Sequence, residues 1–96
     1  MFYVYIITNK RGGTLYIGHT DDLVRRMWEH KNKTREGFSA KYNLNKLVWY
    51  DMFETREDAL NNERRMKEWK RAWKIEKIIE HNPEWNDLTE SLSIIR

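Results

Sequence analysis

The sequence predicts an α+β domain in which a small three-stranded antiparallel sheet is flanked by helices, in the order β-β-α-β-α-α. Two segments dense in β-branched and aromatic residues flank a Gly-Gly turn near the N-terminus, and a third such segment lies in mid-chain. The second half combines many charged residues with apolar residues at helical spacing. A chain of 96 residues can bury one modest core. We therefore expect a single domain over residues 1–96, with an acidic C-terminal tail from about residue 81.

The first two strands are expected to form a β-hairpin. Residues 2–8 (FYVYIIT) and residues 14–18 (TLYIG) have the composition of strands. Residues 9–13 (NKRGG) lie between them and contain two glycines, which can adopt the positive φ angles that tight turns require. These segments therefore predict two antiparallel strands joined by a short turn.

A helix is expected over about residues 22–31. Thr20 or Asp21 can cap its N-terminus, because a side-chain oxygen there accepts a hydrogen bond from a free backbone N–H. The residues expected along its buried face are Leu23, Met27 and His30, with Arg26 beside them. The polar and basic segment 31–42 that follows is typical of a loop that contains a short helical turn.

Residues 47–53 (LVWYDMF) predict the third strand, and two helices follow it. Thr55, with a carboxylate three residues later, resembles a capping box and marks the start of a helix over residues 56 to about 69. A second helical segment covers residues 72–79 and ends before Pro83, which cannot continue a helix.

The composition excludes several classes of protein. The chain has no cysteine, which excludes disulfide scaffolds, thiolate zinc sites and cysteine nucleophiles and fits a reducing compartment. No apolar run approaches the ~20 residues of a membrane span. The first positive charges follow the N-terminal apolar stretch, which is the reverse of a signal peptide. We therefore expect a cytoplasmic protein without a membrane partner.

Charge and aromatic content both bear on the partner. The net charge is +3, yet segment 80–96 holds four carboxylates against one arginine, so the rest of the chain is distinctly basic. A basic body suits a polyanion such as nucleic acid, and it equally fits ordinary solubility. Lys70, Arg71 and Lys74 form either a phosphate-tracking edge or a solvated helix face. Five Trp and five Tyr mainly supply core area, and some can serve as stacking platforms for bases.

Few catalytic motifs are compatible with the sequence. The patterns G-x-x-x-x-G-K-[ST] and G-x-G-x-x-G do not occur, so nucleotide-cofactor sites have no support. The three histidines are far apart and none belongs to an H-E-x-x-H motif, which argues against a zinc hydrolase. The residues that remain as a candidate constellation are Tyr5, Tyr16, Gly18, Arg26, His30 and Glu63.

This constellation resembles the signature of the GIY-YIG nucleases. Residues 3–5 (Tyr-Val-Tyr) and, after ten residues, residues 16–18 (Tyr-Ile-Gly) are similar to the paired motif of that family, although tyrosine stands at position 3 where the motif has glycine. A leucine precedes Arg26 by three residues and His30 follows it by four, as in family members, and Glu63 lies on the helix after the third strand. The chain resembles short stand-alone bacterial members, and also the catalytic domains of the UvrC excinuclease subunit and of GIY-YIG homing endonucleases.

The resemblance implies an endonuclease that hydrolyses DNA phosphodiester bonds with a divalent metal, Mg²⁺ or Mn²⁺. In the family mechanism, Tyr5 is the general base, Glu63 holds the metal and Arg26 clamps the scissile phosphate. The domain has little surface for reading bases. We therefore expect structure-directed or weakly sequence-specific cutting in repair or recombination, with a protein partner as one possible source of specificity.

The remaining motif residues receive supporting roles from the same resemblance. Tyr16 is expected to position water or phosphate, and His30 to be a supporting donor. Gly18 is expected to allow a strand and a helix to pack closely.

The chemistry of these side chains is compatible with such roles, with one open choice. The planar guanidinium of arginine matches a phosphate and keeps its charge, and a single carboxylate suits a Mg²⁺ that retains several waters. Free tyrosine has a pKa near ~10, so Tyr5 needs a cationic setting to act as a base near neutral pH. His19, next to the second motif, is the rival base, because histidine ordinarily titrates near ~6.5. Glu63 can alternatively form an ion pair with Arg64 or Lys67 on its own helix.

Two other functions remain compatible with the sequence. The chain can be a non-catalytic nucleic-acid-binding module, or an interaction protein whose acidic and aromatic tail docks a partner. DNA is favoured over RNA as the nucleic acid, but phosphate contacts alone do not separate the two.

Overall fold

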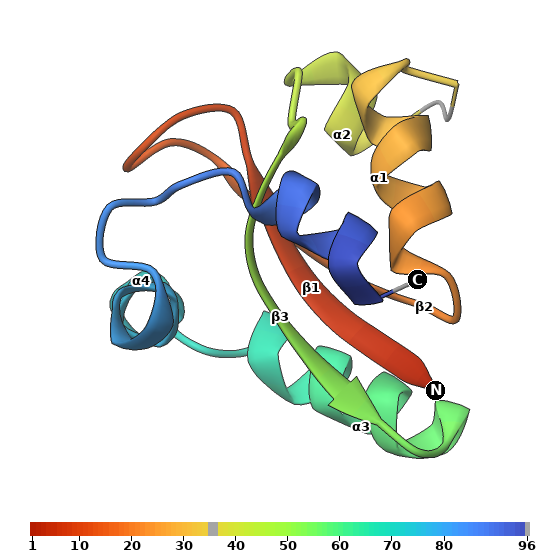
Figure 1. Ribbon diagram of the computed structural model, residues 1–96. Coiled ribbons are helices and arrows are strands. Elements are labelled where there is room, and N and C mark those ends of the chain that lie inside the picture. Colours follow the sequence, from red (N-terminus) through yellow and green to blue (C-terminus); the bar gives the residue numbers. More distant parts are fainter. Residues whose placement is uncertain (35–36, 96) are drawn as a thin grey trace.

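The computed structural model describes residues 1–34 and 37–95 and confirms a three-stranded antiparallel sheet flanked by helices (Figure 1). Residues 35–36 of the predicted loop and Arg96 of the predicted tail lie outside the described residues. Among the helices that are described, none combines the length and the apolar character needed to cross a membrane. In chain order the elements are β1 (Phe2–Thr8), β2 (Leu15–Thr20), α1 (Leu23–Lys31), α2 (Phe38–Lys41), β3 (Lys46–Phe53), α3 (Arg56–Lys67), α4 (Arg71–His81) and the 3₁₀ helix η1 (Leu88–Ile95).

Strand β1 occupies the centre of the sheet, between β2 and β3. Both neighbours run antiparallel to it, and Tyr5 pairs with Gly18 of β2 and with Tyr50 of β3. A strand covered on both faces is apolar along its whole length rather than alternating, and residues 4–8 are accordingly all buried. Strand β2 has a neighbour on one side only, so the two faces of the sheet meet around its free edge.

The alternation of side chains along β1 divides the core into two clusters. Val4 and Ile6 point to the face that α3 and α4 cover, whereas Tyr5 and Ile7 point to the face that α1 and η1 cover (Figure 1). The first cluster also contains Ile17, Val48, Trp49, Ala59, Met66, Ile78 and Trp85. The second also contains Leu23, Met27, Leu44, Leu47 and Leu92. The helices on the two faces can therefore present different side chains to the same three strands.

The start of α1 differs from the sequence-based expectation. Its N-cap is Asp22, whose carboxylate accepts a hydrogen bond of 3.0 Å from the backbone N–H of Arg25. The prediction of Thr20 or Asp21 is wrong because β2 continues through Thr20, which pairs with Tyr3. The Thr20 hydroxyl instead accepts a hydrogen bond of 3.1 Å from the backbone N–H of Asp22.

The other boundaries lie within one or two residues of the expected ones. Thr55 is confirmed as the N-cap of α3, since its hydroxyl accepts a hydrogen bond of 3.1 Å from the backbone N–H of Asp58. Helix α2 is the short helical turn expected between residues 31 and 42. Helix α4 ends at His81, before Pro83, as predicted.

The segment after α4 folds back onto the sheet. The Asn82 side chain donates a hydrogen bond of 3.0 Å to the carbonyl of Val48. Asp87 accepts a hydrogen bond of 2.6 Å from the Lys31 ammonium, and η1 places Leu92 in the core, where it is 1% exposed. The sequence did not predict η1, and it completes the apolar cover of the α1 face.

We expect Asp87→Asn to destabilise the protein at neutral pH and to have little effect in acid. Burial raises the pKa of the Asp87 carboxyl, but hydrogen bonds from groups such as Lys31 and Thr89 outweigh burial and hold that pKa below its ordinary value. A lowered pKa contributes stability above the unfolded-state pKa of ~3.9, and this contribution is lost as pH falls through the folded-state value. Urea unfolding should show a loss of about 1 kcal/mol near pH 7 that shrinks as the pH falls below the unfolded-state pKa.

The matched control for this change is Glu84→Gln. Glu84 is exposed and lies 3.9 Å from Arg11, so its ion pair should contribute little to stability. A destabilisation by Asp87→Asn that persists unchanged in acid would contradict the assigned role of the carboxylate.

Candidate active site

Three polar side chains form a chain of hydrogen bonds from the central strand to α2. The hydroxyl of Tyr5, a residue 1% exposed, lies 3.1 Å from Nε2 of His30 on α1. The Nδ1 atom of His30 lies 3.1 Å from the hydroxyl of Ser39 on α2. If the phenol donates to Nε2, the imidazole must carry its proton on Nδ1, and that proton then points to Ser39. The arrangement links a buried tyrosine to a histidine of fixed orientation.

Gly18 makes room for the tyrosine rings. A Cβ atom at this position would lie 2.7 Å from the Tyr5 hydroxyl and 3.0 Å from a ring carbon of Tyr16. Both distances are shorter than carbon atoms tolerate without a shift of their neighbours. The nearest atoms belong to side chains of the sheet and not to a helix, so the physical reason for glycine differs from the strand–helix packing expected from the sequence.

Tyr16 lies between the tyrosine–histidine pair and the solvent. Its ring centre is 6.5 Å from that of Tyr5 and 6.2 Å from that of His30. The Lys67 ammonium also lies near this ring, 5.8 Å from its centre. Because Tyr16 belongs to the edge strand β2, its half-buried ring stands where the two faces of the sheet meet.

Glu63 lies on the opposite face of the sheet, held between two nitrogen donors. Its side chain is 11% exposed, and its two oxygens lie 2.8 Å from Nδ1 of His19 and 3.2 Å from Nζ of Lys67. His19 reaches α3 because it follows Gly18 on β2, and successive residues of a strand point to opposite faces. The ion pair with Lys67 confirms one of the two pairings expected from the helix, and the partner His19 adds a second.

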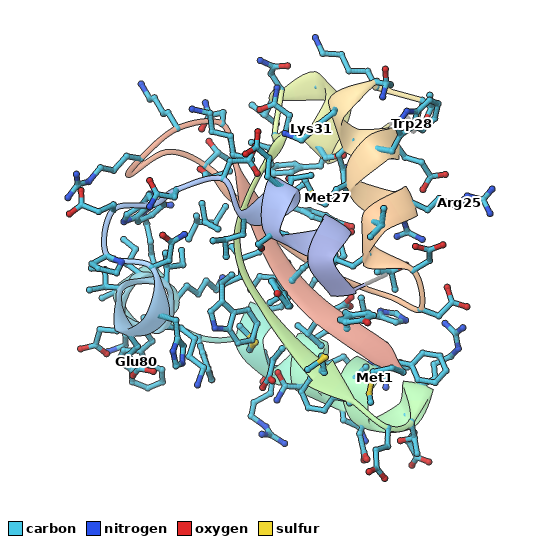
Figure 2. The ribbon with its side chains drawn as sticks, viewed as in Figure 1. Met1, Arg25, Met27, Trp28, Lys31 and Glu80 are labelled. Carbon is cyan, nitrogen blue, oxygen red and sulfur yellow. The ribbon has the colours of Figure 1, made fainter. Side chains whose placement is uncertain are left out.

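Arg26 lies on α1, one turn before His30. Its Nε donates a hydrogen bond of 3.2 Å to Glu29, and its side chain is 23% exposed. It also lines an open pocket of about 510 Å³ at the junction of β2 and α1. The neighbouring Arg25 points away from the body of the molecule (Figure 2). Arg25 is exposed but also lines this pocket, whereas Arg26 is half-buried and held in position by Glu29.

The structure thus gathers most of the predicted site around the free edge of β2. One group lies on the α1 side of the sheet and consists of Tyr5, Tyr16, Gly18 and His30. The other lies on the α3 side and consists of His19 and Glu63. Lys67 connects the two groups, because its ammonium contacts both Glu63 and the ring of Tyr16. Among the residues that the structure describes, each buried side-chain nitrogen and oxygen has a hydrogen-bond partner.

Three basic residues at the start of α4, namely Lys70, Arg71 and Lys74, each contact another group of the protein. The Arg71 guanidinium donates hydrogen bonds of 2.8 and 2.5 Å to the carbonyls of Gly12 and Gly13, and so fixes the hairpin turn. The Lys70 ammonium lies 6.0 Å from the ring centre of Trp73, and Lys74 lies 3.5 Å from the carbonyl of Lys67. The fold accounts for Arg71, and a role of these residues in nucleic-acid binding stays a prediction.

Sequence reasoning missed Ser39 and did not connect Lys67 with the tyrosines. Ser39 lies in a polar loop segment, where nothing in the pattern distinguishes a buried serine from a solvated one. Lys67 is four residues after Glu63, which signals an ion pair on one helix. Its contact with Tyr16 follows only from the way α3 packs against β2.

The sequence pattern of the GIY-YIG catalytic domain matches residues 1–77. The chain belongs to the GIY-YIG family. This family comprises nucleases, which act on nucleic acid and generally depend on a divalent metal. Tyr5, Tyr16, Arg26 and Glu63, the residues that resemble the family signature, all lie within the matched range.

Two relatives and one solved structure are similar to this chain. A UPF0213 protein of Staphylococcus saprophyticus is 35% identical over 82 residues, which cover 81% of this chain and 94% of that protein. A UPF0213 protein of Bacillus pumilus is 35% identical over 66 residues, which cover 65% of this chain and 63% of that protein. The solution NMR structure of a UPF0213 protein from Bacillus halodurans aligns with a TM-score of 0.56 at 25% identity, over 94% of this chain and 96% of that chain.

The surroundings of Glu63 fit a cation held by one carboxylate. Both oxygens of this nearly buried group already accept positive or polar nitrogen donors within 3.2 Å. Among the described residues, no group of three or more histidine or acidic side chains is arranged so that it could hold a metal ion. This donor set suits Mg²⁺, which keeps several waters and takes one or two protein carboxylates together with substrate phosphate. Lys67, whose side chain is 48% exposed, can move aside to free one oxygen.

We expect Gly18→Ala to destabilise the protein by about 1 to 3 kcal/mol, the usual range for added volume in a packed core. The new Cβ forces the Tyr5 hydroxyl away from its position beside His30. Chemical unfolding of the wild type and the variant measures this loss. The same change in a Tyr5→Leu background should cost less, because the ring that collides with Cβ is absent. Equal costs in the two backgrounds would mean that the tyrosine is not the reason for glycine.

Proposed function

We propose that this protein is a metal-dependent endonuclease that hydrolyses DNA phosphodiester bonds in a structure-directed or weakly sequence-specific manner. The observation that carries the proposal is a buried Tyr5–His30 pair on one face of the sheet and a nearly buried carboxylate, Glu63, on the other, connected through Tyr16 and Lys67 beside the edge strand β2. Hydrolysis of a phosphodiester needs a base for water, stabilisation of the phosphoryl oxygens and help for the leaving oxygen. Tyr5 suits the first requirement and Arg26 the second, and solvent water supplies the proton that the leaving oxygen takes up as its bond to phosphorus breaks.

Tyr5 is proposed to activate the attacking water, with His30 as the acceptor of its proton. A free phenol is a poor base near neutral pH, because its pKa is near ~10. The hydroxyl of Tyr5 can pass its proton to Nε2 of His30 at 3.1 Å as it takes one from water. Ser39, at 3.1 Å from Nδ1, keeps the imidazole in the tautomer that accepts at Nε2.

His19 is less suited to be the base. Its Nδ1 is 2.8 Å from Glu63, so the imidazole orients the carboxylate instead. A histidine beside a carboxylate that holds a cation serves to fix that carboxylate. We therefore propose that His19 positions Glu63 and that Tyr5 acts on water.

Arg26 and Glu63 are proposed to balance the charge of the scissile phosphate. The guanidinium of Arg26 is held through Nε by Glu29, and its terminal nitrogens form the planar fork that matches two phosphoryl oxygens. A divalent cation, Mg²⁺ or Mn²⁺, supplies Lewis-acid stabilisation of the phosphate when bound at Glu63. Lys67 neutralises the carboxylate in the meantime, which allows a nearly buried charge to exist without metal.

Repair or recombination in the cytoplasm is the proposed setting. The absence of cysteine from the chain suits a reducing compartment. The alternative of a protein-docking tail has less support, because Asp87 and Leu92 are engaged with the body of the molecule. A non-catalytic nucleic-acid-binding module is the alternative that the following experiment tests.

We expect Arg26→Ala and Glu63→Gln each to reduce DNA cleavage by about 10²-fold or more, as the loss of a charge-stabilising group at a reacting centre usually does. The measurement is the cutting of end-labelled single-stranded, nicked, flapped and branched DNA in Mg²⁺ or Mn²⁺. Arg25→Ala is the matched control, because Arg25 is the adjacent arginine and lines the same pocket but is exposed. Equal losses in Arg25→Ala and Arg26→Ala would reject Arg26 as the specific clamp, and binding without metal-dependent cutting on any substrate would favour a binding module.

We expect the pH dependence of cleavage to identify the base. With His30 as proton acceptor, the rate should rise with pH while the imidazole loses its proton and then level off. In His30→Gln the rate should be lower at neutral pH and should continue to rise into more alkaline solution, because the phenol has lost its internal proton acceptor. Ser39→Ala should lower the plateau without displacing the profile in this way. A profile displaced by His19→Ala but not by His30→Gln would assign the base to His19.

A further inference from the structure

A row of aromatic rings leads from the candidate active site to the solvent. The rings of Tyr16 and Phe38 are stacked, with centres 6.2 Å apart and planes inclined by 26°. The ring of Tyr42 follows, with its centre 4.6 Å from that of Phe38. We call Tyr16, Phe38 and Tyr42 the aromatic row. Its inner end contacts the Tyr5–His30 pair, and its outer end lies at α2, on the same side of the molecule as α1 (Figure 1).

The outer members of the aromatic row are exposed to an extent that the core does not explain. Phe38 is 47% exposed and Tyr42 is 44% exposed, whereas Tyr5 at the other end is 1% exposed. A phenylalanine has no polar group to place in water, so each such ring leaves apolar area uncovered. The exposed faces are continuous with a ring that touches the site, which makes them a surface for a flat apolar group.

A lysine lies over each end of the aromatic row. The Lys41 ammonium is 5.5 Å from the ring centre of Tyr42, and the Lys67 ammonium is 5.8 Å from that of Tyr16. Flat rings flanked by cations complement a ligand that combines flat apolar groups with negative charges at regular spacing. Unpaired nucleotides have this composition, since each carries a base and a phosphate.

We propose that the aromatic row binds unpaired nucleobases of the nucleic acid next to the phosphate that is cut. Phe38 and Tyr42 stack against bases, and Lys41 and Lys67 contact the phosphates on either side of them. The inference rests on the proposed nuclease function and specifies its substrate: a single-stranded segment, flap or frayed end rather than continuous duplex.

Stacking geometry excludes a fully paired duplex from this surface. A base within a duplex already has both faces covered by its neighbours, so it cannot lie on a protein ring unless it leaves the stack. Base–aromatic stacking tolerates every base, because each has a π-face. The aromatic row therefore selects for the unpaired state of the strand and not for its sequence.

The test measures binding separately from cutting. Fluorescence anisotropy with a labelled oligo(dT) and with a labelled hairpin duplex is carried out on the full chain carrying Glu63→Gln, in the presence of EDTA. Phe38→Ala and Tyr42→Ala should each weaken oligo(dT) binding by about five- to 150-fold, the range for loss of one base-stacking ring. Binding of the duplex should change by less than about twofold.

Trp73→Ala is the matched control. Trp73 is 52% exposed and has a lysine 6.0 Å from its ring centre, as the aromatic row does, but it belongs to α4, on the other face of the sheet from α1 (Figure 1). Its loss should leave oligo(dT) binding unchanged. Phe38→Trp and Tyr42→Trp keep an aromatic face and should bind as the parent does, whereas Phe38→Leu and Tyr42→Leu should behave like the alanine variants. Thermal unfolding of each variant shows whether a loss of binding results from a loss of stability.

The outcomes separate this inference from the proposed function. Equal weakening by Trp73→Ala, or unchanged oligo(dT) binding in the alanine and leucine variants, overturns the role of the aromatic row even if the wild type cuts DNA. Selective weakening in Phe38→Ala and Tyr42→Ala, with tryptophan restoring binding, supports it. This result stands even where the wild type cuts no substrate, in which case only the proposed catalysis fails.

Discussion

The antiparallel register that sets Tyr5 opposite Gly18 is the constraint on which the candidate site depends. It places a full-sized tyrosine of the buried central strand against a residue without a side chain, so the phenol can extend to His30 at 3.1 Å. A shift of the register by one residue would turn the side chains of β2 to the other face and bring His19 opposite Tyr5. The register keeps Ile17 in one cluster of the core and Tyr16 against the other, and a slip of one residue would exchange the faces to which these side chains point.

The free edge of β2 allows a site to use both faces of one sheet. Tyr16 and Gly18 point to α1, and His19, which follows Gly18 in the sequence, points to α3. In a central strand, the neighbouring strands on both sides would keep the groups on the two faces apart. At an edge, the long side chain of Lys67 can contact a carboxylate on one face and an aromatic ring on the other. The same carboxylate, Glu63, must have cationic partners because it is nearly buried, and this requirement also suits it to a metal ion.

Local chemistry explains which parts of the fold could be predicted from the sequence. Strand β1 and the hairpin follow from composition and from the glycines of the turn, and Thr55 caps α3 through a contact with a residue three positions away. The cap of α1 was assigned wrongly, since Thr20, Asp21 and Asp22 are all capable caps in sequence and only the pairing of Thr20 with β1 excludes it. The 3₁₀ helix η1 was missed because its stability comes from packing against distant strands rather than from its own pattern.

The sequence by itself determined the fold class, the family signature and the spacings that place His30 one turn after Arg26 and Lys67 one turn after Glu63. These relations act within one strand or one helix, where periodicity fixes which side chains are neighbours. Only the tertiary structure decided that Ser39 supports His30 and that the aromatic row leads away from Tyr16. Those contacts join segments that are distant in the chain, and they depend on how helices pack on a particular face of the sheet. No local periodicity encodes that packing, because it results from the burial of two apolar faces at once.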